Sequence, residues 1–139
     1  MPVTEPKRVL LLGAETELGQ ACAEALAEAG ARLTLVSSKP DVSSAFAVQR
    51  LARKLGASAQ AIDATNEAAV RVMLRQVSKD LGGLDATVVC VADSAALSHT
   101  ERLARREMAR SGDGVFVVAA DSRGVVDVVA AVAASPANG

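Results

Sequence analysis

The sequence contains no tryptophan, no tyrosine and only two phenylalanines among its 139 residues, although half of its residues are hydrophobic. Aromatic side chains usually contribute a large share of the apolar area that a protein core buries. Here the core has to be built from alanine, valine and leucine instead. These small side chains allow helices to approach a sheet closely, so the composition suits a layered α/β domain.

Cysteine and histidine are also scarce: His99 is the only histidine, and Cys22 and Cys90 are the only cysteines. The two cysteines are far apart in the sequence and fall within an expected helix and an expected strand. We therefore predict neither a disulfide framework nor a zinc site, and we expect no bound metal. Cys90 has no neighbouring His or Lys, which favours a small buried apolar residue over a nucleophile.

Neither sign of charge is in excess, because 15 basic residues oppose 16 acidic ones and the formal net charge is -1. Proteins that bind nucleic acid without sequence preference need an excess of Lys and Arg, so we do not expect a nucleic-acid partner. One local concentration of positive charge comprises Arg102, Arg105, Arg106 and Arg110. Its spacing is typical of a solvated helix face.

Long apolar runs are missing as well. Residues 1–7 lack the apolar segment of a secretory signal, and Asp127 and Ser135 interrupt the longest apolar stretch before it reaches membrane-spanning length. We expect a cytoplasmic protein with no membrane partner.

Short apolar runs alternate with segments of helical periodicity along the chain. Runs without polar alternation are typical of strands that are covered on both faces. Glycines follow most of the periodic segments, as is common after helix C-termini. We predict strands at 8–12, 32–36, 57–62, 86–91 and 114–119, and helices at 18–29, 43–55, 67–81 and 95–110.

The last apolar segment, 124–134, fits either a helix or a sixth strand, and its place in the alternation favours a helix. In the helix at 43–55 we expect Phe46, Leu51 and Leu55 on or near one side. Strands and helices that alternate at this length form a parallel sheet with right-handed crossovers. We therefore predict one α/β domain over residues 1–139. It is a doubly wound, Rossmann-like three-layer sandwich with five parallel strands, or six if the last segment is a strand.

The turn after the first strand carries two glycines, Gly13 and Gly19, at the start of a helix. Glycines at such a turn allow backbone to approach a pyrophosphate, which the free N–H groups of a helix N-terminus attract. Glu15 and Glu17 lie between them, and their carboxylates either satisfy the helix terminus or repel an anion there. Plain packing of the helix against the strand explains the two glycines equally well.

These segments together resemble the short-chain dehydrogenase/reductase family. The resemblance rests on the stretch from Leu12 to Gly19, on Asp63-Ala64-Thr65, on Leu84-Asp85 and on Met108 through Gly114, in that order and spacing. It implies an NAD- or NADP-binding domain. The implied cofactor-binding residues are Gly13, Thr16, Leu18, Gly19, Ser37, Asp63, Ala64 and Ala92.

Two of these positions also indicate how the cofactor would be recognised. In the family, the residue that Asp63 matches hydrogen-bonds the adenine amino group; a turn residue ahead of the next helix is the alternative role. NAD users carry an acidic residue where this chain has Ser37. The run Ser37-Ser38-Lys39 slightly favours NADP over NAD, with a solvated loop as the alternative.

The chain also departs from the family pattern. Glu17 replaces the middle glycine of the first motif, and Val89 to Ala92 replace the Asn-Asn-Ala-Gly that ends the fourth strand. The family's catalytic Tyr-x-x-x-Lys is absent, since there is no tyrosine and no lysine after Lys79. Asp121 or Ser122 stands near the family's catalytic serine without a proton relay. We expect a shortened member with no catalytic residues and no hydride transfer by the family's mechanism.

The fifth strand, Val115 to Ala119, is expected at the edge of the sheet, where an apolar strand promotes association. In the family the helices that flank this strand form the dimer interface. We expect a homodimer or tetramer that uses Leu103 to Met108 and Val125 to Val132. Three functions remain open: a nucleotide-binding sensor, a structural subunit with a vestigial cofactor cleft, and an oxidoreductase that a partner chain completes.

Overall fold

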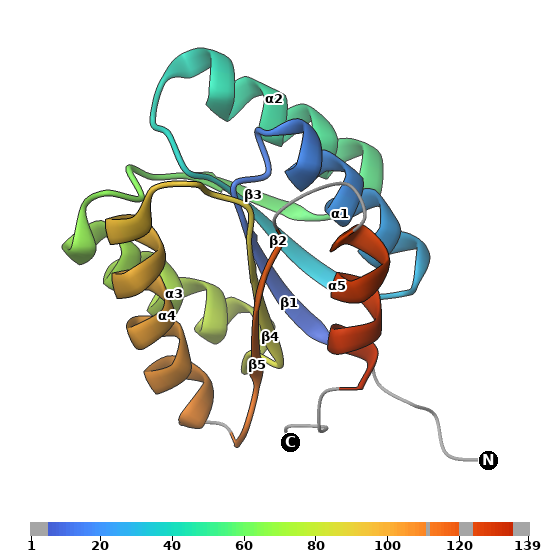
Figure 1. The fold of residues 1–139 in the computed structure, drawn as a ribbon. Coiled ribbons are helices and arrows are strands. Elements are labelled where there is room, and N and C mark those ends of the chain that lie inside the picture. The colour runs from blue at the N-terminus through green and yellow to red at the C-terminus, as the bar shows by residue number, and fades with distance from the viewer. Residues whose placement is uncertain (1–5, 111, 120–123, 135–139) are drawn as a thin grey trace.

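The computed structural model describes residues 6–110, 112–119 and 124–134. Strands and helices alternate throughout this part of the chain (Figure 1). The strands are β1 (Arg8–Leu12), β2 (Arg32–Ser37), β3 (Ser58–Ala61), β4 (Ala86–Val89) and β5 (Val115–Val118). The helices are α1 (Glu17–Glu28), α2 (Val42–Leu55), α3 (Glu67–Leu81), α4 (Ser94–Ala109) and α5 (Gly124–Ala133).

The five strands form one parallel sheet in the order β3-β2-β1-β4-β5, which confirms the predicted doubly wound fold. The last segment is the helix α5, as its place in the alternation indicated. Within the described residues β5 is an edge strand, as expected. β4 ends at Val89 and is shorter than predicted, because the chain beyond it turns into the loop before α4.

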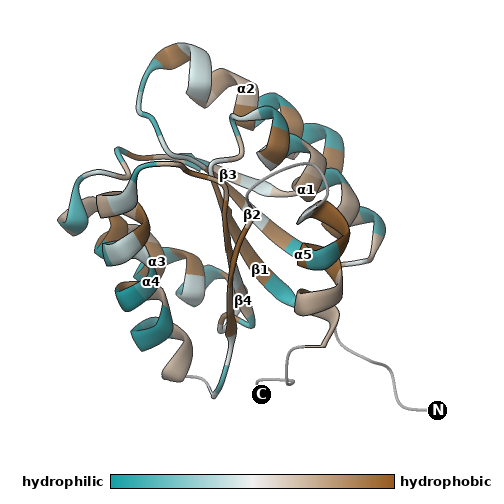
Figure 2. Ribbon diagram, in the orientation of Figure 1, coloured by the Kyte–Doolittle hydropathy of each residue, from teal (hydrophilic) through white to brown (hydrophobic). Residues whose placement is uncertain are grey.

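Helices cover both faces of the sheet. Along β1, Val9 and Leu11 pack toward α1, α2 and α5, whereas Leu10 and Leu12 pack toward α3 and α4. All four side chains are fully buried, since the strand is covered on both sides. Figure 2 shows these strands as the most hydrophobic part of the ribbon. The two cores therefore consist almost entirely of aliphatic residues.

One helix differs from the expectation. Phe46 of α2 is 59% exposed, and the residues that this helix buries are Val48, Leu51 and Ala52. At 3.6 residues per turn, five positions rotate a side chain by about 140° away from the first. Phe46 and Leu51 therefore cannot share the narrow face that α2 turns toward the sheet, and the prediction for Phe46 was wrong.

Most of the apolar residues expected to form the association surface are buried within the chain itself. Leu103 and Met108 of α4 and Val128 and Val132 of α5 are buried against the chain's own sheet. Val126 of α5 remains 74% exposed. The exposed part of the predicted surface is thus much smaller than its apolar sequence indicates.

Candidate functional site

The turn between β1 and α1 is built around its two glycines. Gly13 has φ +94°, and a Cβ there would lie 2.6 Å from the carbonyl oxygen of Cys90. A Cβ on Gly19 would lie well under 3.0 Å from the carbonyl oxygen of Gly13. Any larger residue at either position would clash with backbone, so the close packing of the turn alone requires both glycines.

Thr16 caps the helix that follows. Its hydroxyl accepts a hydrogen bond from the backbone N–H of Gly19 at 2.9 Å and donates to the carbonyl of Gly13 at 2.8 Å. The backbone N–H groups of Glu17 and Leu18 have no acceptor among the described residues. The first turn of α1 therefore keeps two free donors at the positive end of the helix dipole.

Glu15 turns away from the helix terminus and toward the end of β2. Its carboxylate accepts hydrogen bonds from both the backbone N–H of Ser38, at 2.9 Å, and the Ser38 hydroxyl. Glu17 is exposed and forms no hydrogen bond or ion pair with the other described residues. Of the two acidic residues in the turn, only Glu15 occupies the space beside the end of β2.

Ser37 does not take the place that its sequence position suggested. It is fully buried, and its hydroxyl bonds to the backbone of Lys39, accepting from the N–H and donating to the carbonyl at 2.7 Å. Ser38 reaches the solvent-facing side instead. The contact between Glu15 and Ser38 follows from the neighbouring positions of β1 and β2 in the sheet, because the residues that follow these two strands then lie close together.

A cleft of about 700 Å³ opens at the carboxyl ends of the strands. This is where ligands bind in open α/β sheets. Of the residues predicted to bind a cofactor, Thr16, Asp63, Ala64 and Ala92 line the cleft, whereas Gly13, Leu18, Gly19 and Ser37 do not. The full lining comprises Glu15, Thr16, Ser38, Lys39, Pro40, Ser44, Asp63, Ala64, Thr65, Cys90, Val91, Ala92, Asp93 and Ala96.

Asp63 has the turn role that its sequence position allowed, ahead of α3, whereas its contact with an adenine stays a prediction. Its carboxylate accepts hydrogen bonds from the Thr65 hydroxyl, at 2.6 Å, and from the Thr65 backbone N–H, at 3.0 Å. These bonds hold the pKa of Asp63 below its usual value. The side chain is nevertheless exposed in the cleft, so its free lone pairs face any ligand there.

His99 supports this side of the cleft. Its Nε2 lies 2.7 Å from the carbonyl oxygen of Ala64, which makes Nε2 the donor. Asp93 caps α4 by accepting from the N–H of Ala96 at 2.7 Å. Both residues therefore have local structural roles, and the carboxylates of Glu15, Asp63 and Asp93 make the lining acidic with Lys39 as its one cation among the described residues.

The two cysteines meet behind the cleft, a contact that their sequence separation did not predict. Cys22 of α1 and Cys90 after β4 are both buried free thiols, and they hydrogen-bond to each other. This bond and burial raise the pKa of the Cys90 thiol. The same bond lowers the pKa of the Cys22 thiol, so Cys90 is the neutral partner of the pair and a poor nucleophile.

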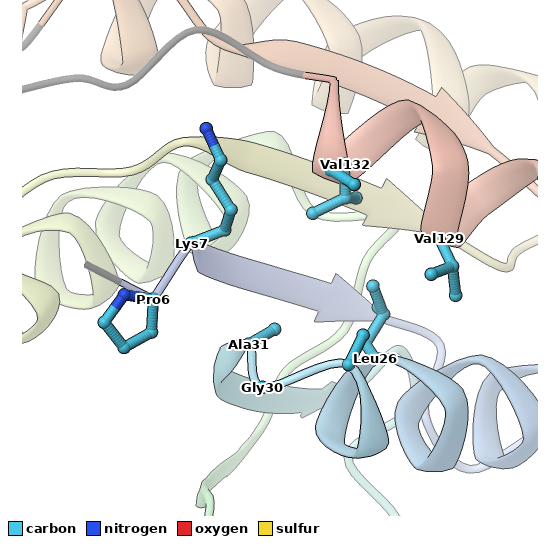
Figure 3. Close-up of a pocket in the computed structure, with 9 residues that line it drawn as sticks. Pro6, Lys7, Leu26, Gly30, Ala31, Val129 and Val132 are labelled. Atoms are coloured by element: carbon cyan, nitrogen blue, oxygen red, sulfur yellow. The ribbon is translucent and has the colours of Figure 1, made fainter. Parts of the chain in front are cut away.

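A second hollow lies at the opposite end of the sheet, at the start of β1 (Figure 3). It measures about 390 Å³, and its walls come from Leu26, Gly30 and Ala31 at the end of α1 and from Val129 and Val132 of α5. The lining is apolar apart from Lys7. It is separate from the carboxyl-end cleft, and Lys7 is the one charged residue among the described residues that line it.

The remaining predictions concern metal ligands and membrane-spanning helices. Among the described residues no three His, Cys, Asp or Glu side chains gather as metal ligands. None of the helices that the structure describes has both the length and the apolar character to span a bilayer. Asp121 and Ser122, which stood near the family's catalytic serine, lie outside the described residues.

Comparison with known proteins identifies the fold and the family. A family model described as enoyl-(acyl carrier protein) reductase matches residues 13–134. A short-chain type dehydrogenase/reductase from Mycobacterium marinum is 27% identical, with a TM-score of 0.66 over 85% of this chain and 57% of that one. The corresponding enzyme structure from Mycobacterium ulcerans is 25% identical, with a TM-score of 0.68 over 81% of this chain and 50% of that one. NAD+-bound xylitol dehydrogenase shares the fold at 21% identity, with a TM-score of 0.70 over 92% of this chain and 60% of that one.

No curated protein matches the chain significantly in sequence. The chain spans little more than half the length of the Mycobacterium marinum protein. The family model, by contrast, covers most of the chain and includes the glycine turn, the cleft and α5. By this match and by its strand order, the chain belongs to the short-chain dehydrogenase/reductase family.

Proposed function

We propose that this chain is a nucleotide-binding module that holds an adenine dinucleotide of the NAD type and does not transfer hydride by itself. The observation that carries the proposal is the start of α1, where Thr16 lines the cleft and the N–H groups of Glu17 and Leu18 directly after it are free. Free donors at the positive end of a helix favour a diphosphate. Asp63, ionised and exposed in the cleft, suits the amino group of an adenine.

Glu15 favours NAD over NADP. Its carboxylate lies against Ser38 after β2, where a ribose hydroxyl can donate to it and a 2′-phosphate would be repelled. Two unit charges about 4 Å apart repel by about 4 kcal/mol at an effective dielectric constant of about 20. This contact argues against the NADP preference that the serine-rich loop indicates.

Several features support the absence of independent hydride transfer. The chain has no tyrosine, so the phenolic acid/base that the family uses has no counterpart here. α5, which follows β5, contains neither tyrosine nor lysine. A partner chain that supplied the missing groups would restore oxidoreductase chemistry, and this is the alternative that an assay must address.

A structural role is favoured by a different observation. β5 has no strand partner on its outer side among the described residues, and Val118 and Val126 are 49% and 74% exposed. Apolar side chains beside an open strand edge promote association. We propose that two copies associate through this region, whether or not the cleft is occupied.

Thermal unfolding in the presence of NAD, NADH, NADP and NADPH tests the binding proposal. A ligand that binds only the native state stabilises it by about 2.7 kcal/mol at a hundredfold excess over its dissociation constant. We expect a saturable rise of the midpoint with NAD and a smaller one with NADP. Glu15→Gln should improve NADP binding about tenfold or more, because it removes the carboxylate charge.

A cleft-blocking variant controls for binding elsewhere. Ala92 is exposed in the cleft, so Ala92→Trp fills it without disturbing the core, whereas Ala109→Trp adds the same bulk at the exposed end of α4. Only Ala92→Trp should abolish the shift. An absent shift at millimolar NAD, or an equal shift in both variants, would contradict the proposal. Steady oxidation of NADH by the pure protein with carbonyl substrates would contradict its non-catalytic part.

A further inference from the structure

Helices α3 and α4 lie side by side on one face of the sheet (Figure 1). Arg102 of α4 forms an ion pair with Glu67 of α3. One turn further along both helices, Arg106 follows Arg102 and Arg71 follows Glu67. At this next turn, the position of the oppositely charged pair Arg102 and Glu67 is taken by two positively charged residues, Arg106 and Arg71.

A second turn repeats this pattern, with Arg110 on α4 and Arg75 on α3. All four arginines line one small hollow between the helices, and its volume is about 70 Å³. Leu74 and Leu103 complete the wall, and Glu107 is the only acidic residue in the lining. Figure 2 shows the strongly hydrophilic lower turns of α4 on this side of the molecule.

The four guanidinium groups in this arginine hollow face one carboxylate, that of Glu107, among the described residues of the lining. None of Arg71, Arg75, Arg106 and Arg110 forms an ion pair with another described residue, whereas Arg105 on the same helix pairs with Glu101. Like charges one turn apart destabilise a helix. Here two such pairs converge from two helices, and an anion bound between them would relieve the repulsion.

The shape and size of the arginine hollow indicate which anion fits. Guanidinium groups bind planar pairs of oxygens on phosphate or carboxylate through two parallel N–H donors. At about 70 Å³ the hollow is far smaller than the carboxyl-end cleft of about 700 Å³, so it suits one small oxyanion and not a nucleotide. A shallow groove of about 500 Å³ continues from Arg75 and Arg110 toward Lys79 and Gly82, with room for the rest of a larger molecule.

We propose that the arginine hollow binds the phosphate group of a small phosphorylated ligand, whose remainder lies in the groove toward Lys79. The site is distinct from the carboxyl-end cleft, because the two linings have no residue in common. It does not depend on whether the cleft binds a dinucleotide.

Titration with inorganic phosphate against chloride at constant ionic strength tests this site in the purified chain. Isothermal calorimetry should show saturable binding. The double variant Arg71→Gln/Arg106→Gln should weaken it at least tenfold, and should be more stable than wild type in the absence of phosphate, since it relieves the repulsion. The matched control Arg102→Gln/Arg105→Gln removes the same charge from ion-paired positions and should change phosphate affinity less than twofold.

Three outcomes would overturn the proposal. The first is an equal loss of phosphate binding in both double variants, which would indicate a diffuse charge effect. The second is loss of binding in Ala92→Trp, which would place the phosphate in the carboxyl-end cleft. The third is an absence of phosphate binding while an unphosphorylated acidic peptide binds, which would make the surface a protein interface.

Discussion

The carboxylate of Asp85 accepts three hydrogen bonds from Arg8. The backbone N–H of Arg8 donates at 2.7 Å, its Nε at 3.0 Å and a terminal guanidinium nitrogen at 3.2 Å. The pair lies at the amino ends of β1 and β4, and the Asp85 side chain is only 4% exposed. The backbone of Asp85 also bonds to Val115, so this residue connects three strands. Asp85 belongs to the stretch that marked the family in the sequence, yet its role here is structural.

Replacing Asp85 should destabilise the fold strongly. Asp85→Ala leaves the largely buried guanidinium of Arg8 without its partner, and breaking a buried pair in this way costs about 3–5 kcal/mol. Asp85→Asn keeps one acceptor oxygen and should cost less. Urea unfolding followed by circular dichroism measures both. Equal stability of Asp85→Ala and wild type would show that the pair contributes nothing.

Gly19 and Gly30 are glycines for different structural reasons: Gly19 lies against backbone, and Gly30 has a positive φ. Gly19→Ala brings a Cβ against the Gly13 carbonyl and should cost about 1–3 kcal/mol or more, as overpacking does. An open helical position would instead gain about 1 kcal/mol from the same change. Gly30 has φ +91° but open space around it, so Gly30→Ala should cost only its backbone strain, about 1 kcal/mol. Thermal unfolding of the two variants tests whether Gly19→Ala is the more damaging, and a stabilised Gly19→Ala would disprove the close approach.

Cys90 should resist alkylation in the native state. Its hydrogen bond with Cys22 and its burial raise the pKa of the thiol, so little thiolate forms at neutral or mildly alkaline pH. Taken alone, the raised pKa of Cys90 makes the fold less stable as pH rises above about 8.5, while the lowered pKa of Cys22 acts in the opposite direction. Mass spectrometry after iodoacetamide treatment at several pH values measures the reaction. Cys22→Ala should lower the pKa and speed the alkylation of Cys90, and rapid labelling of the wild-type protein would contradict the assignment.

The fold could be predicted largely because burial leaves a local pattern. Val9 to Leu12 form an uninterrupted apolar run since helices cover both faces of β1, and such a run is visible without any tertiary knowledge. Phe46 shows the limit of this reasoning. An aromatic residue in a helical segment suggests a buried side, but its five-residue separation from Leu51 places the two on different faces.

The candidate site was less predictable because its decisive contacts join distant residues. The glycines of the turn are local and were found, whereas the contact of Glu15 with Ser38 spans 23 positions and depends on a side-chain direction. The meeting of Cys22 and Cys90 requires the packing of α1 on β4. The arginine hollow combines the arginines of α4 with Arg71 and Arg75 of α3, which are distant from them in the sequence.

Val126 offers the sharpest test of association. It is 74% exposed on α5, so Val126→Glu removes no packing within the chain and places a charge on the proposed contact surface. We expect wild-type protein to self-associate in sedimentation velocity, and Val126→Glu to shift it to monomer with an unchanged melting midpoint for the dissociated chain. Val42→Glu is the matched control, because Val42 is 75% exposed on α2, away from β5. A wild-type protein that sediments as a monomer at high concentration, or equal dissociation by both variants, would show that the open edge of β5 is not the contact surface.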